Sequence, residues 1–168
     1  MTAPNDNEIG WLDHVRQLST QMARLSCRDR AGRELGADNG FARWTAMTRA
    51  LRQARATVYL AGNGASAALA SHMAADLAKN AGVRTETFTD PALVTAVAND
   101  LGYDQVFAAP LRHRARPTDM LVLISSSGAS PNCLVAANTA LDLGVTVVTL
   151  TAMSGTNPLR RRGDLNFH

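Results

Sequence analysis

Apolar residues recur at helical spacing in the first third of the chain. Residues 11–25 carry them at a period close to 3.6, which predicts an amphipathic helix. Residues 27–40 are polar and glycine-rich, which is typical of a loop, and residues 41–54 repeat the helical pattern. The apolar stripes of both helices must cover a sheet or a partner subunit. The candidates for a subunit interface are Trp11, Leu18, Met22, Phe41 and Met47.

From residue 57 onward, short β-branched runs alternate with helical segments. The strand-like runs are TVYLA at 57–61, RTETFT at 84–89, MLVLI at 120–124, VTVVTLT at 145–151 and DLNFH at 164–168. This alternation predicts βαβ units and an α/β fold. We expect a three-layer, doubly wound, flavodoxin-like fold, in which helices cover both faces of a five-stranded parallel sheet. A single domain is expected over 1–168, with two N-terminal helices in 1–56 and the α/β section in 57–168.

Composition narrows the class of protein. The chain has 168 residues, of which 46% are hydrophobic and 18% charged, as in one globular domain. It contains no apolar run near the roughly 20 residues of a membrane helix, and residues 1–11 do not resemble a secretory signal. The arginine clusters at 112–116 and 160–162 lack interleaved aromatics, which does not favour nucleic-acid binding. Cys27 and Cys133 form no CxxC motif, which indicates a reduced, cytoplasmic protein.

The sharpest chemical signal follows the third predicted strand, in the segment SSSGASP. Its hydroxyl groups belong to Ser125, Ser126, Ser127 and Ser130. Pro131 occupies the expected first position of a helix, with Ser130 as its N-cap. Free N–H groups and the helix dipole attract an anion there, so the loop predicts a phosphate site. The alternative is a serine-rich capped turn. Cys133, in the next helical turn, is either a reactive thiol or a small buried apolar residue.

A second loop links the first predicted strand to its helix. It consists of Gly62, Asn63, Gly64, Ala65 and Ser66. The loop matches neither GxGxxG nor a Walker A motif. NAD binding remains open, since Glu86 lies in the second predicted strand and Asp90 just after it.

Two pairs of polar residues are further candidates. His72 and Asp76 are four residues apart on one helix face, where they can chelate a divalent metal or act as an acid–base pair. The alternative is a structural pair, with Asp76 bonded to His72 or Lys79. Asn99 and Asp100 fall at a predicted helix break, where they either cap the helix or reach a sugar hydroxyl.

Taken together, these motifs resemble the SIS (sugar isomerase) domain family, and within it the phosphoheptose isomerase branch. The resemblance covers about residues 40–168 and includes GNGAS, the His72–Asp76 pair, ANDLGYDQVF and LVLISSSGASPN. It implies an aldose–ketose isomerase that converts sedoheptulose 7-phosphate to glycero-manno-heptose 7-phosphate through an enediol. It also implies a cytoplasmic homotetramer with active sites at subunit interfaces.

The resemblance assigns roles residue by residue. The phosphate would be held by Ser125, Ser126, Ser127 and Ser130. The first substrate loop would be formed by Asn63, Gly64, Ala65 and Ser66. Asn99 and Asp100 would contact the sugar, and Asp76 would be the catalytic acid/base. His72 and Asp76 also match positions that bind zinc in some members.

Three features depart from the family pattern. Asp76 stands where many members have Glu, AMSGTNPL replaces the usual Gly-Gly after the fourth strand, and the family's final helix, with its Gln and His, is absent from the 168 residues. That His is the family's second acid/base group. The missing helix and the Asp at position 76 would also fit an alternative of another class, a non-catalytic SIS module that senses a sugar phosphate or scaffolds a protein partner. The retained His72, the carboxylate of Asp76 and the Asn99–Asp100 pair favour the isomerase.

Overall fold

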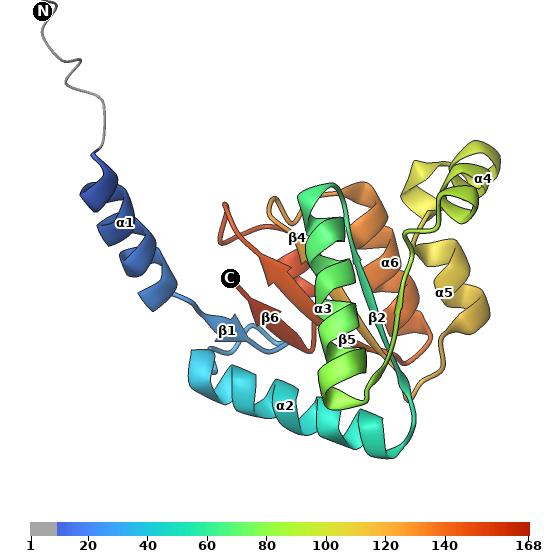
Figure 1. Cartoon of the computed structure of the whole chain (residues 1–168), viewed down its shortest axis with the longest axis horizontal. Helices are drawn as coiled ribbons and strands as arrows, with labels where there is room; N and C mark the ends of the chain where they lie inside the picture. Colours follow the sequence, from blue (N-terminus) through green and yellow to red (C-terminus); the bar gives the residue numbers. More distant parts are fainter. Residues whose placement is uncertain (1–9) are drawn as a thin grey trace, which may run out of the picture.

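A six-stranded sheet forms the centre of the computed structural model, which describes residues 10–168 (Figure 1). The strand order is β1-β6-β5-β4-β2-β3. The strands are β1 (Cys27–Arg28), β2 (Thr57–Gly62), β3 (Arg84–Thr87), β4 (Met120–Ser125), β5 (Thr146–Thr151) and β6 (Leu165–Phe167). Strands β2 to β6 are parallel to one another, which confirms the predicted five-stranded parallel sheet.

The sixth strand, β1, was not predicted. It lies in the segment interpreted as a loop and pairs antiparallel with β6, Cys27 opposite Phe167. The Glu34 carboxylate accepts hydrogen bonds from the Cys27 N–H at 3.1 Å and from Arg28 Nε at 3.0 Å. A two-residue strand is too short for hydrophobic alternation to reveal. The sheet therefore has six strands rather than five.

Helices cover both faces of the sheet, as predicted. The helices of the described chain are α1 (Trp11–Ala23), which does not cover the sheet, α2 (Ala37–Gln53), α3 (Ala65–Ala81), α4 (Pro91–Leu101), α5 (Ala108–Arg114) and α6 (Pro131–Asp142), with short 3-10 turns η1 (Tyr103–Gln105) and η2 (Leu159–Arg161). α2 and α3 pack on one face, and α4 to α6 pack on the other. The second helix begins at Ala37 rather than at Phe41.

Strand β4 explains why two apolar clusters form. Leu121 and Leu123 face α6, whereas Met120 and Val122 face α3, because successive strand residues point to opposite faces. All four side chains are fully buried. A strand covered on both sides reads as a continuous apolar run, which is what its sequence shows.

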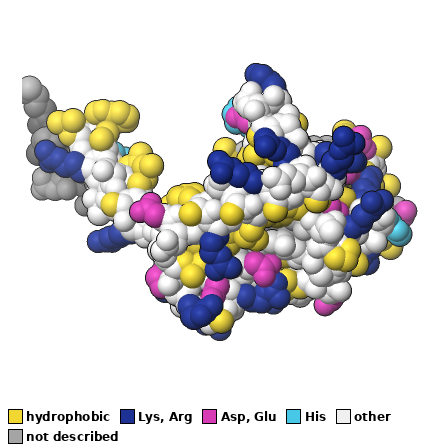
Figure 2. Space-filling model, turned by 90° about the horizontal axis from the view of Figure 1, so that it is seen from below, with side chains coloured by type: hydrophobic (Ala, Val, Ile, Leu, Met, Phe, Trp, Pro, Cys, Tyr) yellow, Lys and Arg dark blue, Asp and Glu magenta, His cyan; other side chains and the backbone are white. Residues whose placement is uncertain are grey.

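Helix α1 stands apart from this core (Figures 1 and 2). None of its residues is buried, and Trp11, Leu18 and Met22 are 80%, 63% and 70% exposed. Met47 of α2, also predicted as an interface residue, instead packs against the core of its own chain. Phe41 stacks on Phe167 at 4.9 Å between ring centroids, yet stays 45% exposed. The stripe on α1 therefore remains without a partner in the described chain.

No helix among the described residues has the length and apolar character needed to cross a membrane. The expectation that the N-terminus is not a secretory signal rests mainly on residues 1–9, which lie outside the described residues.

Candidate active site

The two predicted ligand loops leave the sheet side by side. Residues 62–66 follow β2 and residues 125–131 follow β4, and these strands are parallel neighbours with Gly62 opposite Ile124. The direction in which successive strands are added to the sheet also reverses here. From β2 the chain passes to β3 on one side and then returns to β4 on the other side. Open α/β sheets bind ligands beyond the carboxyl ends of their strands at such a switch point.

A reciprocal amide pair ties the two loops together. The Asn132 side chain donates to Asn63 Oδ1 at 2.8 Å, and Asn63 Nδ2 donates back to Asn132 Oδ1 at 3.0 Å. The Tyr103 hydroxyl adds a bond to Asn63 Oδ1 at 3.2 Å. Asn132 is 2% exposed. In the sequence, Asn132 is marked only as a polar residue at the start of an apolar helix, and it is not among the predicted site residues. The Asn63 side chain therefore positions the loops.

Internal hydrogen bonds fix the shape of the serine loop. The buried Ser125 hydroxyl accepts from the Gly128 N–H at 3.2 Å and lies 3.4 Å from the Ser130 hydroxyl. Gly128 has a positive φ of 61°, and a Cβ there would lie 2.0 Å from Asn157 Oδ1. Only glycine fits such a position. Ser126 and Ser127 remain exposed.

The turn is capped less completely than predicted. Ser130 and Pro131 occupy the N-cap and the first turn of α6, but the Ser130 side chain makes no capping bond. The Asn132 side chain instead accepts the Cys133 N–H at 3.0 Å. The serines are therefore not explained by capping alone, and their predicted contact with a phosphate stays a prediction.

His72 and Asp76 lie together on α3, as their spacing predicts. His72 Nε2 is 3.4 Å from Asp76 Oδ2, and the two side chains are 78% and 54% exposed. Asn80 also donates to Asp76, at 3.3 Å. Among residues 10–168, no ion pair joins Asp76 to Lys79. The carboxylate therefore remains accessible to a ligand.

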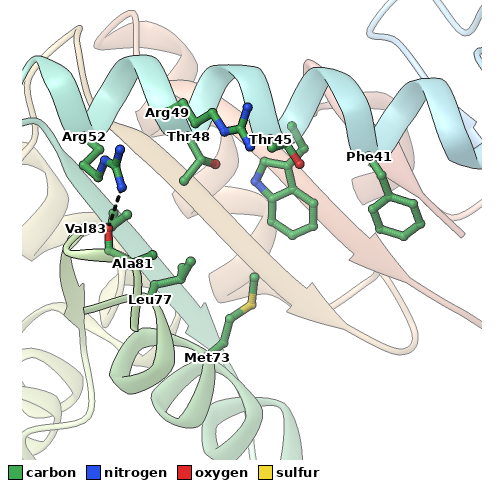
Figure 3. A pocket seen from close by; sticks show the side chains of 10 residues that line it. Phe41, Thr45, Thr48, Arg49, Arg52, Met73, Leu77, Ala81 and Val83 are labelled. Atoms are coloured by element: carbon green, nitrogen blue, oxygen red, sulfur yellow. Dashed lines mark hydrogen bonds between the residues drawn. The ribbon is translucent and has the colours of Figure 1, made fainter. Parts of the chain in front are cut away.

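An open cavity of about 570 Å³ lies beside this pair. Its walls include Leu69 and Leu77 of α3, Ile124 of β4 and Leu150 of β5. Ile124 immediately precedes the serine loop, so the cavity places Asp76 beside the carboxyl end of β4. The cavity shares Met73 and Leu77 with a groove of about 330 Å³ between α2 and α3 (Figure 3).

The residues available for zinc are too few for a site of their own. Within residues 10–168, no group of three or more His, Cys, Asp or Glu side chains could hold a metal. Protein zinc sites use three or four ligands, whereas His72 and Asp76 supply two. Zinc binding by this pair stays a prediction that needs further ligands.

Asn99 and Asp100 occupy the last turn of α4. Asn99 donates to Asp100 Oδ1 at 2.8 Å, and both residues are exposed. The helix continues to Leu101 and ends at Gly102, which has a positive φ of 98°. The interpretation of the pair as a helix-capping turn is therefore wrong. Contact of these side chains with a sugar stays a prediction.

The two acids that left NAD binding open have other contacts. Glu86 forms an ion pair with Arg114. Asp90 caps α4, where its Oδ1 accepts the Leu93 N–H at 2.8 Å. Both carboxylates are therefore engaged within the chain.

Cys133 is fully buried, and burial raises the pKa of its thiol to about 11. Cys133 is therefore a small buried core residue, which was one of its two interpretations, and not a reactive thiol. Cys27 is likewise a buried free thiol.

The sequence is similar to that of a known family and of its members. Residues 41–152 match the SIS domain family. The phosphoheptose isomerase of Mycobacterium tuberculosis (strain ATCC 25177 / H37Ra) is 48% identical over 109 residues, which cover 61% of this chain and 56% of that protein. The chain thus aligns with little more than half the length of this curated relative.

Solved structures give the same picture. A phosphoheptose isomerase from Francisella tularensis superposes with a TM-score of 0.74 at 25% identity, over 92% of this chain and 82% of that one. Phosphoheptose isomerase GmhA from Neisseria gonorrhoeae gives 0.67 at 30% identity, over 74% and 70%.

Proposed function

The chain belongs to the SIS domain family, and from that premise we propose that it is a phosphosugar isomerase acting on sedoheptulose 7-phosphate. One observation carries the proposal beyond family membership. The GNGAS loop and the serine loop follow the adjacent strands β2 and β4, and the cavity beside Asp76 is lined by Ile124, close to the carboxyl end of β4. This arrangement supports a site in which the serine loop binds a phosphate and Asp76 acts as a base. The relatives named phosphoheptose isomerase support the heptose substrate.

The phosphate group anchors the substrate in the site. The exposed hydroxyls of Ser126 and Ser127, with N–H groups at the start of α6, would bind it, while Ser125 holds the loop from within. These donors are neutral, which suits an anion that must also leave. Binding energy from the distant phosphate then fixes the position of the reacting carbons.

The reaction transfers a hydrogen from C1 to C2 and a second one between the oxygens on these carbons. A base removes a proton from C1 of the ketose while the C2 carbonyl oxygen gains one, which gives the enediol; C2 is then protonated while the C1 hydroxyl loses its proton, which gives the aldose. We assign the base to Asp76, because its carboxylate is accessible beside the cavity. His72, 3.4 Å from Asp76, is a positioning residue for that carboxylate. Asn99 and Asp100 are proposed to contact the sugar.

Conversion of the substrate tests the proposal. Full-length protein is incubated with sedoheptulose 7-phosphate, and the anomeric protons of the aldose product are followed by NMR. We expect the aldose to accumulate with the phosphorylated ketose and much more slowly with unphosphorylated sedoheptulose. Binding of the phosphate ester without any product would instead support the sensor or scaffold module.

We also propose that the protein acts as a homo-oligomer, with a tetramer implied by the family. The exposed stripe on α1 and the apolar groove between α2 and α3 support this (Figure 3). Changing both Leu18 and Met22 to Glu should lower the mass measured by light scattering, whereas Gln17→Glu on the opposite side of α1 should not. A wild-type protein that is a monomer at all concentrations would contradict the proposal.

A cytoplasmic location remains a proposal too. Both cysteines are free thiols, which supports a reducing compartment.

A further inference from the structure

A second polar cavity lies away from the candidate active site, at the β1 edge of the sheet. It has a volume of about 380 Å³ and opens between the turn at 28–32, the loop after β5 and the turn η2. Among residues 10–168, four arginines line it, namely Arg28, Arg30, Arg160 and Arg161, and Asp29 is the only acidic residue in its wall. The proposed isomerase uses none of these residues.

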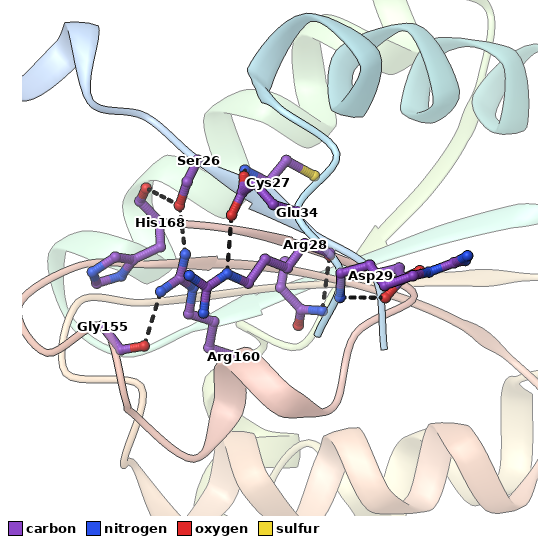
Figure 4. A network of polar contacts seen from close by, with 10 residues as sticks. Ser26, Cys27, Arg28, Asp29, Glu34, Gly155, Arg160 and His168 are labelled. Carbon is purple, nitrogen blue, oxygen red and sulfur yellow. Dashed lines mark hydrogen bonds and ion pairs between the residues drawn. The ribbon is translucent and has the colours of Figure 1, made fainter. Parts of the chain in front are cut away.

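Arg160 is the unusual member of this wall (Figure 4). It is only 8% exposed. Its guanidinium donates to the Gly155 carbonyl at 2.8 Å and to the Ser26 hydroxyl, both of which are neutral acceptors. Its Nε is buried without a hydrogen-bond partner, and no carboxylate among the described residues forms an ion pair with it. A buried charge without a counter-charge is costly, so binding of an anion beside Arg160 would be favourable.

The nearby acids are engaged elsewhere. Glu34 pairs with Arg28 at 3.0 Å, Asp164 pairs with Arg30 at 2.7 Å, and Asp29 pairs with Arg33. Glu34 still acts on Arg160 by raising its pKa, but burial and Arg28 outweigh this effect and lower that pKa overall.

Burial and the positive charge of the arginines lower the pKa values of two neighbouring groups, Arg160 and His168. The neighbouring Arg28 adds to burial in lowering the pKa of Arg160. After burial, Arg160 and then Arg28 are the next causes that lower the pKa of His168. The cavity wall thus carries an excess of positive charge.

We infer that this cavity is a second anion site, which binds a small phosphate-bearing molecule between Arg160, Arg161 and Arg28. Guanidinium groups recognise phosphate through paired N–H donors, and two of the five donors of Arg160 are used within the chain. The volume lies within the range of small-molecule pockets. The inference does not depend on the proposed isomerase activity.

The loop after β5 separates this cavity from the serine loop. The Ala152 N–H donates to Ser126 O at 3.0 Å, and the Leu159 N–H donates to Gly128 O at 3.0 Å. Gly155 and Arg160 of the same segment face the cavity. Because both sites contact this segment, a test must block anion binding at the serine loop while it observes binding at the cavity.

The test follows the Nε–Hε NMR signal of Arg160 in full-length, ¹⁵N-labelled protein as inorganic pyrophosphate is added. We expect a saturable shift, and the same shift in Ser127→Asp, which places a negative charge in the serine loop. Arg161→Gln should weaken the apparent affinity about tenfold through loss of a charged donor. Arg84→Gln, an equal change of charge on the exposed edge strand β3, should leave it unchanged. Arg161 is itself exposed, so its substitution should not disturb folding.

Three results would overturn the inference. The shift could increase linearly without saturation, or it could vanish in Ser127→Asp. The apparent affinity could also weaken equally in Arg84→Gln and Arg161→Gln. A further arm adds a single-stranded oligonucleotide to the wild-type protein. Displacement of pyrophosphate by the oligonucleotide at far lower concentration would contradict the assignment to a small molecule. Isomerase activity is not read in any arm, so failure here leaves the proposed function standing.

Discussion

The two faces of the sheet are covered unequally. On the face of α4 to α6, Leu121, Cys133 and Ala136 are fully buried against one another. On the face of α2 and α3, two connected apolar hollows remain open, and Leu69 is 58% exposed. Asp76 and His72 stand on this open side. The covered face thus supplies the stability of the fold, and the incompletely covered face carries the candidate chemistry and the surfaces that a partner could cover.

The largest expected effect is that of Asp76→Asn, which removes the basic oxygen from the open face. The isomerisation rate should fall about 10²–10⁴-fold, as expected for loss of general acid–base catalysis. Affinity for sedoheptulose 7-phosphate, measured by calorimetry, should stay the same because the groups that anchor the phosphate are untouched. Asp142→Asn, an exposed substitution at the end of α6, is the control. An unchanged rate in Asp76→Asn would make that carboxylate structural.

The difference in coverage should also appear in stability. Leu121→Ala opens a cavity in the covered face and should cost about 2–5 kcal/mol of unfolding free energy. Leu69→Ala, on the open face, should change it by less than about 0.5 kcal/mol. Urea denaturation of both variants measures the contrast. Equal losses would show that the open face is covered in solution.

Cysteine chemistry gives a smaller contrast between the same faces. With its pKa raised to about 11, Cys133 is almost entirely protonated at pH 8. Its alkylation by iodoacetamide should be about 100-fold slower than that of an unperturbed thiol, and slower still through burial. A cysteine placed on the open face by Leu69→Cys should react at an ordinary rate. Peptide mass spectrometry distinguishes the sites, and comparable rates would contradict a closed core around Cys133.

The smallest expected effect is on melting temperature. Phosphate at ten times its Kd should stabilise the fold by about 1.4 kcal/mol, or roughly 3–5 °C for a domain of this size. Ser127→Asp should remove the part of this shift that comes from the serine loop, through like-charge repulsion, and leave only the contribution of the second anion site. The control Ser19→Asp, on the exposed helix α1, should keep the whole shift. A shift that survives Ser127→Asp undiminished would point to the second anion site instead.

Local patterns were enough to predict most of the fold. The run MLVLI and the alternation around it identify a strand buried on both faces, and Ser130-Pro131 marks the start of α6. The His72–Asp76 contact follows from helical spacing alone. Such signals lie within a few residues of one another, so a single sequence contains them.

Contacts between distant residues escaped prediction. The Asn63–Asn132 pair joins residues 69 positions apart, and Tyr103 reaches Asn63 across 40. The short strand β1 depends on β6, which lies at the other end of the chain. The exposure of Arg160 could not be judged from an arginine-rich stretch, because its burial depends on the turn at 28–32 and on Gly155.

The most direct test of the account is proton exchange at C1 of sedoheptulose 7-phosphate in deuterated water, catalysed by the full-length wild-type protein. If Asp76 and the serine loop form one isomerase site, deuterium enters C1 of the ketose when the enediol returns to substrate, and C2 of the aldose when it goes on to product. Ser127→Asp should then weaken substrate binding, and Asp76→Asn should stop exchange while binding persists. Tight binding of the sugar phosphate by the wild-type protein without any exchange at C1 would contradict the account.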